Sequence, residues 1–111
     1  MVKLKKWKLE DNLVKEINTV DGFNTEIKSG KKLVDFYAPW CGPCLKLGPI
    51  LEDMSVDVNY DIVKVNIDVC PEVAATYSVK SIPMLILFND GEVEKTSLGL
   101  RTKNELIDEF V

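Results

Sequence analysis

The sequence predicts an α/β fold in which a central mixed β-sheet carries helices on both faces. Strand-like and helix-like segments alternate along the first two thirds of the chain, which favours parallel strands joined by right-handed crossovers. Late in the chain, residues 89–91 (Asn-Asp-Gly) are typical of a hairpin turn and add an antiparallel pair. The 111 residues suffice for one domain with its own core and are too few for two.

Five strands are expected. Residues 13–17 alternate weakly and indicate an edge strand, whereas residues 33–38 (LVDFYA) form a nearly continuous apolar run, typical of a buried parallel strand. Residues 61–68 alternate cleanly between apolar and polar. The apolar segment 83–88 (PMLILF) and the returning segment 92–98 form the hairpin.

Four helices separate or follow these strands, so the expected order is β-α-β-α-β-α-β-β-α. The first helix is expected to be capped by Asp21 and to end near residues 29–30, where glycine suits a C-cap. The second has apolar residues at helical spacing between 47 and 54. Pro71 suits the first turn of the third helix, and residues 102–105 (TKNE) form a capping box that starts the last one.

The composition excludes several classes of function. The 14 basic and 18 acidic residues give a net charge of −4, which offers no electrostatic basis for binding nucleic acid or an anionic membrane. The chain has no histidine, which excludes a Ser-His-Asp triad, a Cys-His pair and a histidine metal site. The basic N-terminus lacks the apolar region of a signal peptide, and no apolar run approaches the length of a membrane span. We therefore expect a cytoplasmic protein.

Residues 40–44 (WCGPC) place two of the three cysteines at the start of a predicted helix. Unpaired N–H groups and the helix dipole stabilise a thiolate there, so the pKa of Cys41 should fall, whereas Cys44 should be less exposed and less acidic. Gly42 and Pro43 suit the tight turn. The spacing brings both sulfurs to one face, close enough to bond. Cys41 can then attack a target disulfide, and Cys44 can resolve the mixed disulfide.

Other interpretations of the cysteines are weaker. A structural zinc site needs four ligands, and beyond the pair the chain offers only Cys70 and no histidine. A permanent structural disulfide is disfavoured by the very small loop and the reducing compartment. Cys70 itself, at a helix start, is best interpreted as an inert free thiol; the alternative is a partly acidified thiol that forms dimers on oxidation.

Asp35 interrupts the apolar strand six residues before Cys41. By alternation it shares a face with Leu33 and Tyr37, which favours burial. Burial raises the pKa of a carboxyl group, and such a group near the cysteines could take the proton of Cys44. The alternative is a carboxylate that faces solvent or pairs with a lysine.

The segments VDFYAPWCGPCLKLGPIL, VKVNID, SIP and FNDGEV, together with a late Gly99, resemble the thioredoxin family in content and order. The resemblance runs from about residue 13 to the C-terminus, and leaves residues 1–12 as an N-terminal arm. It implies the thioredoxin fold as a single domain over residues 13–111, and protein-disulfide reductase activity through a reversible Cys41–Cys44 dithiol/disulfide.

The resemblance also implies roles for individual residues. Cys41 corresponds to the family's nucleophile and Cys44 to its resolving cysteine. Asp35 matches the buried aspartate of the family, and Lys64 matches a lysine near that aspartate. Four residues would form the apolar surface that receives the substrate chain: Trp40, Ile82, Pro83 and Gly99. The resemblance also implies a cis peptide bond before Pro83. Independently of the resemblance, the ring of Trp40 next to the cysteines offers a flat apolar surface on which a partner could dock.

Three residues depart from the commonest family pattern. Tyr37 stands where tryptophan is frequent, which should affect little beyond packing and fluorescence. Leu45 follows the motif where a basic residue is common, so the charge near the site is lower. Met84 replaces a common threonine after the proline, so the preferred partners can differ.

No bound cofactor is expected, because the dithiol is itself the redox centre. The chain has no G-x-G-x-x-G loop for a nucleotide, so we expect electrons to come from a separate reductase, and the resemblance implies that this partner is a thioredoxin reductase. We expect a monomer that reduces disulfides in protein substrates. A disulfide-forming oxidant is the alternative within redox chemistry. A non-catalytic scaffold subunit is the alternative outside it, although a scaffold has no physical reason to combine Cys41, Cys44 and Asp35.

Overall fold

The computed structural model describes residues 14–110, so the predicted N-terminal arm lies outside the described residues. Nine elements follow one another in the predicted order, β-α-β-α-β-α-β-β-α. Their bounds are β1 (Val14–Ile17), α2 (Val20–Ile27), β2 (Lys31–Tyr37), α3 (Gly42–Ser55), β3 (Asp61–Asn66), α4 (Pro71–Thr76), β4 (Met84–Asn89), β5 (Glu92–Leu98) and α5 (Lys103–Glu109).

The strands form one mixed sheet in the order β1-β3-β2-β4-β5. The pairs β1–β3 and β2–β3 are parallel, whereas β2–β4 and β4–β5 are antiparallel. The first strand is therefore an edge strand and the apolar second strand a central one, as the sequence predicts.

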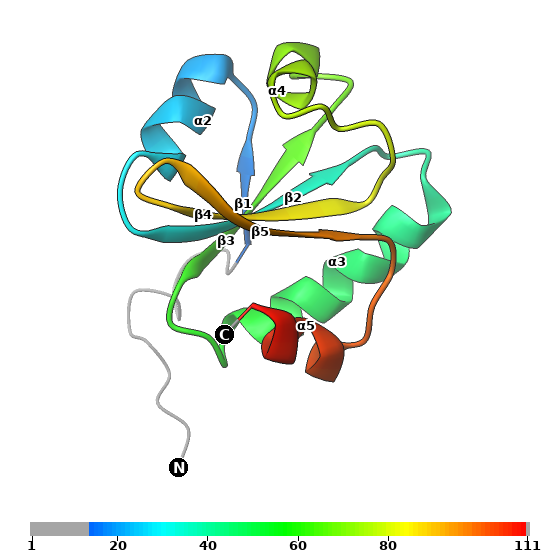
Figure 1. Ribbon diagram of the computed structural model, residues 1–111. Helices are drawn as coiled ribbons and strands as arrows, with labels where there is room; N and C mark the ends of the chain where they lie inside the picture. Colours follow the sequence, from blue (N-terminus) through cyan, green and yellow to red (C-terminus); the bar gives the residue numbers. More distant parts are fainter. Residues whose placement is uncertain (1–13, 111) are drawn as a thin grey trace.

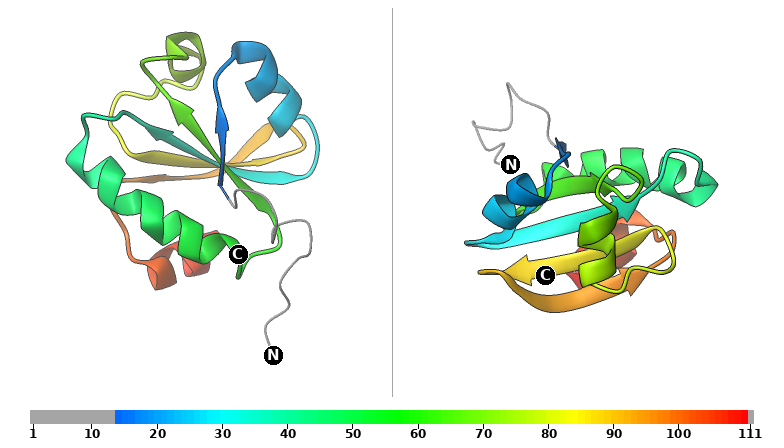
Figure 2. Two further views of the ribbon diagram at one scale, coloured as in Figure 1. Left: turned by 180° about the vertical axis from the view of Figure 1, so that it is seen from behind. Right: turned by 90° about the horizontal axis from the view of Figure 1, so that it is seen from above.

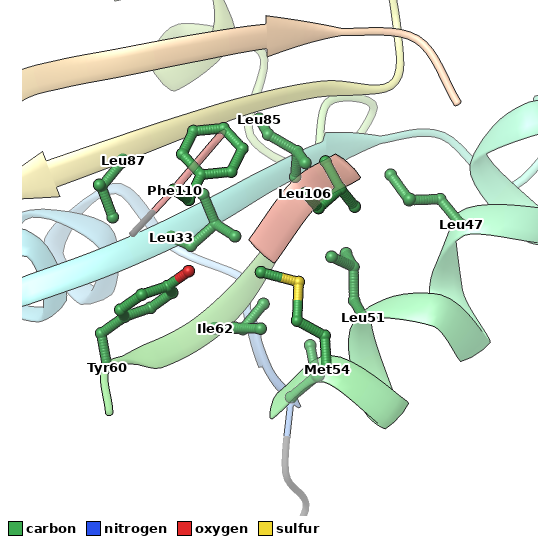
Figure 3. Packing of buried hydrophobic residues seen from close by; sticks show 11 residues of the cluster. Leu33, Leu47, Leu51, Met54, Tyr60, Ile62, Leu85, Leu87, Leu106 and Phe110 are labelled. Carbon is green, nitrogen blue, oxygen red and sulfur yellow. The ribbon is translucent and has the colours of Figure 1, made fainter. Parts of the chain in front are cut away.

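Two helices cover each face of the sheet. Figure 1 shows α2 and α4 on one side and α3 and α5 on the other, and the view from behind in Figure 2 agrees. Alternate residues of each buried strand divide between the two cores because successive side chains of a strand point to opposite faces. On β2, Leu33 packs with Leu47 and Leu51 of α3 (Figure 3), whereas Val34 packs with Phe23 of α2.

The first helix differs from its prediction at both ends. Its N-cap is Thr19, whose hydroxyl accepts a hydrogen bond from Gly22 N–H at 2.9 Å. Asp21 instead lies in the first turn, where its negative charge interacts favourably with the positive end of the helix dipole. The helix ends at Ile27, and Gly30 serves the following turn, where its N–H donates to the Asp90 carboxylate at 2.7 Å.

Other predicted element boundaries agree more closely with the structure. The capping box of α5 is confirmed in both directions, with the Thr102 hydroxyl and the Glu105 carboxylate each accepting a backbone N–H. The third strand ends at Asn66, not Asp68, because the Asn66 side chain accepts the N–H of Asp68 and turns the chain. No helix within residues 14–110 is both long and apolar enough to cross a membrane.

Candidate active site

The two cysteines of the WCGPC segment lie at the N-terminus of α3 and are joined by a disulfide. Cys41 is the N-cap residue, and its Sγ accepts the Cys44 N–H at 3.2 Å. Pro43 lies in the first turn, where its missing N–H removes no intrahelical hydrogen bond. The helix thus directs a backbone donor and its positive end at Cys41, the arrangement that stabilises a thiolate on that sulfur.

The two cysteines differ less in exposure than the sequence suggests. Cys41 is 7% exposed and Cys44 is 4% exposed, because both pack with Ala38, Ile67 and Ile82. Cys41 is the more exposed of the two cysteines, as expected, but it too is nearly buried. The lower pKa of Cys41 stays a prediction for the reduced protein, since neither cysteine titrates in the disulfide.

Asp35 is fully buried in the centre of the sheet, so the prediction of burial is confirmed and the solvent-facing alternative is wrong. Within residues 14–110 neither of its carboxyl oxygens has a hydrogen-bond partner. Burial raises the pKa of the carboxyl to about 7, while the charge of Lys64 opposes the shift and that of Glu16 adds to it. Lys64 is the register partner of Asp35 on β3, and no ion pair joins the two. The result is a carboxyl group that exchanges its proton near neutral pH.

The residues expected to receive a substrate come from three segments that meet near Cys41. The Ile82–Pro83 peptide bond is cis, as the resemblance implies, and the Ile82 carbonyl oxygen lies 3.9 Å from Cys41 Sγ. Gly99 N–H donates to the Pro83 carbonyl at 2.9 Å. Trp40, which precedes Cys41 in the chain, is 69% exposed. The end of β2, the start of β4 and the end of β5 lie at the same end of the sheet (right in Figure 1).

Comparison with known proteins decides the family. The thioredoxin family model matches residues 14–111. The chain belongs to the thioredoxin family. It is 45% identical to the thioredoxin of Chlamydia muridarum over 93 residues, which cover 83% of this chain and 91% of that protein. A Staphylococcus epidermidis thioredoxin is also 45% identical, over 81% of this chain and 88% of its own.

A solved structure agrees with these sequence relatives. A mutant thioredoxin from Halobacterium salinarum superposes with a TM-score of 0.82 at 30% identity and covers 87% of both chains. The fold is thus the thioredoxin fold that the sequence predicts. The chain is a thiol–disulfide oxidoreductase of the protein-disulfide reductase type, and its redox centre is the Cys41–Cys44 pair.

Two polar residues of this thioredoxin-family site escape the sequence analysis. Asp68 accepts the Trp40 indole N–H at 2.9 Å and fixes the exposed ring. Glu16 accepts a hydrogen bond from the Tyr37 hydroxyl and contributes to the charge around Asp35. Both contacts join segments far apart in the chain, so local sequence pattern carries no indication of either.

Cys70 lies away from this chemistry. Only 1% of the residue is exposed, and it packs in the core on the α2 side of the sheet. Burial, followed by the charge of Glu72, raises the pKa of its thiol, so the alternative of an acidified thiol is wrong. Its sulfur also makes no cap hydrogen bond at the start of α4. The inert-thiol interpretation therefore agrees with the structure, and dimerisation through an accessible Cys70 loses its basis.

Proposed function

We propose that this chain is a general reductase of protein disulfides, in which Cys41 attacks, Cys44 resolves and a separate thioredoxin reductase restores the dithiol. The observation that carries the proposal is the position of the Cys41 sulfur, which caps α3 and accepts the Cys44 N–H. That position favours negative charge on Cys41 over Cys44.

In the first step the Cys41 thiolate attacks one sulfur of the substrate disulfide. A Cys41–substrate S–S bond forms, the substrate S–S bond breaks, and the second substrate sulfur leaves as a thiolate with the electron pair. The backbone donor at Cys41 lowers the energy of the attacking thiolate before the step. The leaving thiolate takes a proton from solvent.

In the second step the Asp35 carboxylate takes the proton of the Cys44 thiol. The resulting thiolate attacks Cys41 Sγ, a Cys41–Cys44 disulfide forms, and the Cys41–substrate bond breaks to release the second substrate thiolate. The face of β2 that carries Asp35 is the one that α3 covers, as the packing of Leu33 against Leu47 supports. A pKa of about 7 lets Asp35 both hold and accept a proton at neutral pH.

A separate reductase completes the cycle by delivering two electrons and two protons to the Cys41–Cys44 disulfide. The sequence contains no dinucleotide-binding loop, which supports an external source. A reducing compartment such as the cytoplasm suits this direction of electron flow. We propose a monomer, because one chain carries all the residues to which we assign a role.

The apolar surface of Trp40, Ile82, Pro83 and Gly99 would receive the substrate chain, with Ile82 offering backbone hydrogen bonds to an extended segment. Leu45 is 60% exposed in the first turns of α3, and Met84 follows the cis-proline at the start of β4. These two apolar residues favour substrates with apolar side chains around the disulfide over substrates selected by charge.

Trp40→Ala is expected to lower kcat/KM for a protein disulfide by roughly 10-fold, because a central exposed aromatic anchor is removed. The rate with a small disulfide, which does not cover the surface, should change by less than about 2-fold. Val93→Ala is the matched control, since Val93 is also exposed and lies on the edge strand β5. Equal losses with both substrates would argue against Trp40 as a docking residue.

The test of the proposed function is the reduction of insulin by dithiothreitol, followed by turbidity. The wild-type protein should accelerate the reaction well beyond dithiothreitol alone, and the double variant Cys41→Ser/Cys44→Ser should not accelerate it at all. A wild-type protein no faster than dithiothreitol would contradict a general reductase. Full function of the double variant in cells would instead indicate a scaffold role.

A further inference from the structure

Three charged residues form a row across adjacent strands near the active site. Glu16 on β1 is the register partner of Lys64 on β3, and Lys64 is the register partner of Asp35 on β2. Register partners of neighbouring strands point to the same face of a sheet. One lysine therefore lies between two acidic side chains, the exposed Glu16 at the sheet edge and the buried Asp35 at its centre.

The row lies on the face of the sheet that α3 covers. The residues two positions earlier on the same strands, Val14, Ile62 and Leu33, all belong to the core formed with Leu47 and Leu51 of α3. Figure 3 shows Ile62 and Leu33 in this core with the two leucines of α3. Because side chains of a strand alternate, the three charged residues share that face. The row is thus on the same side of the sheet as the helix that carries the cysteines.

Tyr37 contacts two of the three charged residues in the row, Glu16 and Lys64. It is two residues after Asp35 on β2, its hydroxyl donates to Glu16 Oε2, and Lys64 Nζ lies 4.4 Å from the centre of its ring. Burial and the hydrogen bond to Glu16 raise the pKa of the Tyr37 hydroxyl, so it remains a donor throughout the neutral range. The ring attracts the ammonium group, and the hydroxyl holds the carboxylate. Tyr37 thus does more than pack, contrary to the expectation from the sequence.

We propose that Glu16, held in place by Tyr37, is a positioning residue that competes with Asp35 for the charge of Lys64 and thereby sets the pH at which Asp35 takes the proton of Cys44. The inference rests on the proposed role of Asp35 as proton acceptor. The step itself is unchanged: the proton moves from the Cys44 sulfur to the Asp35 carboxylate, and the Cys44 thiolate attacks Cys41.

Among the groups around Asp35, Glu16 and Lys64 are the two whose charges act on its carboxyl. β3 contributes Lys64, β1 contributes Glu16, and β2 itself contributes Tyr37. β4 places the apolar Leu85 opposite Asp35, and the covering helix α3 carries the buried Cys44 in its first turn.

The charged residues of the two covering helices lie outside this group. α3 carries Lys46, Glu52 and Asp53, all of which are exposed. The buried residue of α5 is the apolar Leu106, and the buried C-cap residue Phe110 is apolar as well. The charge of Lys64 favours the ionised carboxylate of Asp35, and that of Glu16 opposes it.

The experiment follows the carboxyl carbon of Asp35 by NMR in the oxidised protein, where the cysteines do not titrate. Glu16→Gln should lower the titration midpoint by roughly 0.3 to 0.7 pH unit, the size expected for a partly screened charge. Tyr37→Phe should lower it by a smaller amount. Glu92→Gln, which removes the same charge at the opposite edge of the sheet, should leave it unchanged.

A second set of variants tests the route through Lys64. Lys64→Gln alone should raise the midpoint of Asp35, and Glu16→Gln should have a smaller effect in that background than in the wild type. An unchanged midpoint in Glu16→Gln would overturn the proposal. An equal shift with and without Lys64 would overturn the competition for Lys64.

The kinetic consequence separates this inference from the proposed function. In the reduced protein, the pH profile of substrate release from the mixed disulfide should move with the NMR midpoint. If Asp35→Asn leaves that profile unchanged, Asp35 is not the proton acceptor and the proposed function fails at that step. If only the Glu16→Gln midpoint fails to move, the proposed function stands and the inference about Glu16 does not.

Discussion

Asp35→Asn is expected to raise the free energy of unfolding of the oxidised protein by about 4 kcal/mol at about pH 8. The carboxyl has a pKa of about 7 in the fold, against an ordinary value of 3.8. At pH values between these two pKa values, the folded chain holds a proton that the unfolded chain has released, so the free energy of unfolding falls as the pH rises. The destabilisation is complete above the folded pKa and vanishes below the unfolded one.

Denaturant unfolding at several pH values measures this effect. The advantage of Asp35→Asn should be largest at about pH 8 and approach zero near pH 4, because a neutral aspartic acid and an asparagine differ little in charge or volume. Asp108→Asn, on the exposed face of α5, should stay within about 0.5 kcal/mol of the wild type. An advantage of equal size at all pH values would show that packing, not ionisation, is responsible.

A residue that destabilises its own fold at working pH calls for a functional reason. Asp35 is fully buried, its oxygens have no hydrogen-bond partner within residues 14–110, and an apolar residue of similar volume would avoid the cost. A carboxyl with a pKa near neutrality is the group that general acid–base catalysis at neutral pH requires. The expected gain in stability and the expected loss of proton transfer therefore come from one property of the site.

The elements of the fold could be predicted from local pattern because each has a strong local cause. The apolar run before the motif can only be a buried strand, and the Thr102–Glu105 pair caps a helix through its own side chains. The prediction that Asp21 caps α2 is wrong because Thr19 and Asp21 are both acceptable N-cap residues. The sequence does not show that it is the Thr19 hydroxyl that accepts the Gly22 N–H.

The parts of the site that could not be predicted depend on which strands are neighbours. Nothing in the alternation of β1 and β3 says that Glu16 lies beside Lys64, since β1 could have been placed at the other edge of the sheet. The contact of Tyr37 with Glu16 and that of Trp40 with Asp68 follow only once the strand order exists. The disulfide, by contrast, joins residues of one helix turn, and its chemistry was accessible from spacing alone.

Cys44→Ser is expected to stop turnover and to trap the substrate. The Cys41 thiolate still attacks, so one substrate chain becomes attached by a disulfide, but the serine oxygen cannot form the second S–S bond and the adduct persists. Mass spectrometry under non-reducing conditions should show one substrate per protein, and dithiothreitol should release it. The experiment is best done in a Cys70→Ala background, which removes the third thiol and places no hydroxyl in the apolar core around that position.

Cys41→Ser is the matched variant that decides which sulfur attacks. It keeps one cysteine of the pair, yet the remaining Cys44 lacks the place at the helix N-cap and is exposed by only 4%. Its thiol should therefore ionise less and reach a protein disulfide poorly, so little adduct should form. The exposure of Cys41 is only 7%, so access alone explains a small part of any difference between the two variants. If both variants trap substrate equally well, the N-terminus of α3 does not select the nucleophile, and the order of attack and resolution must be set by the substrate.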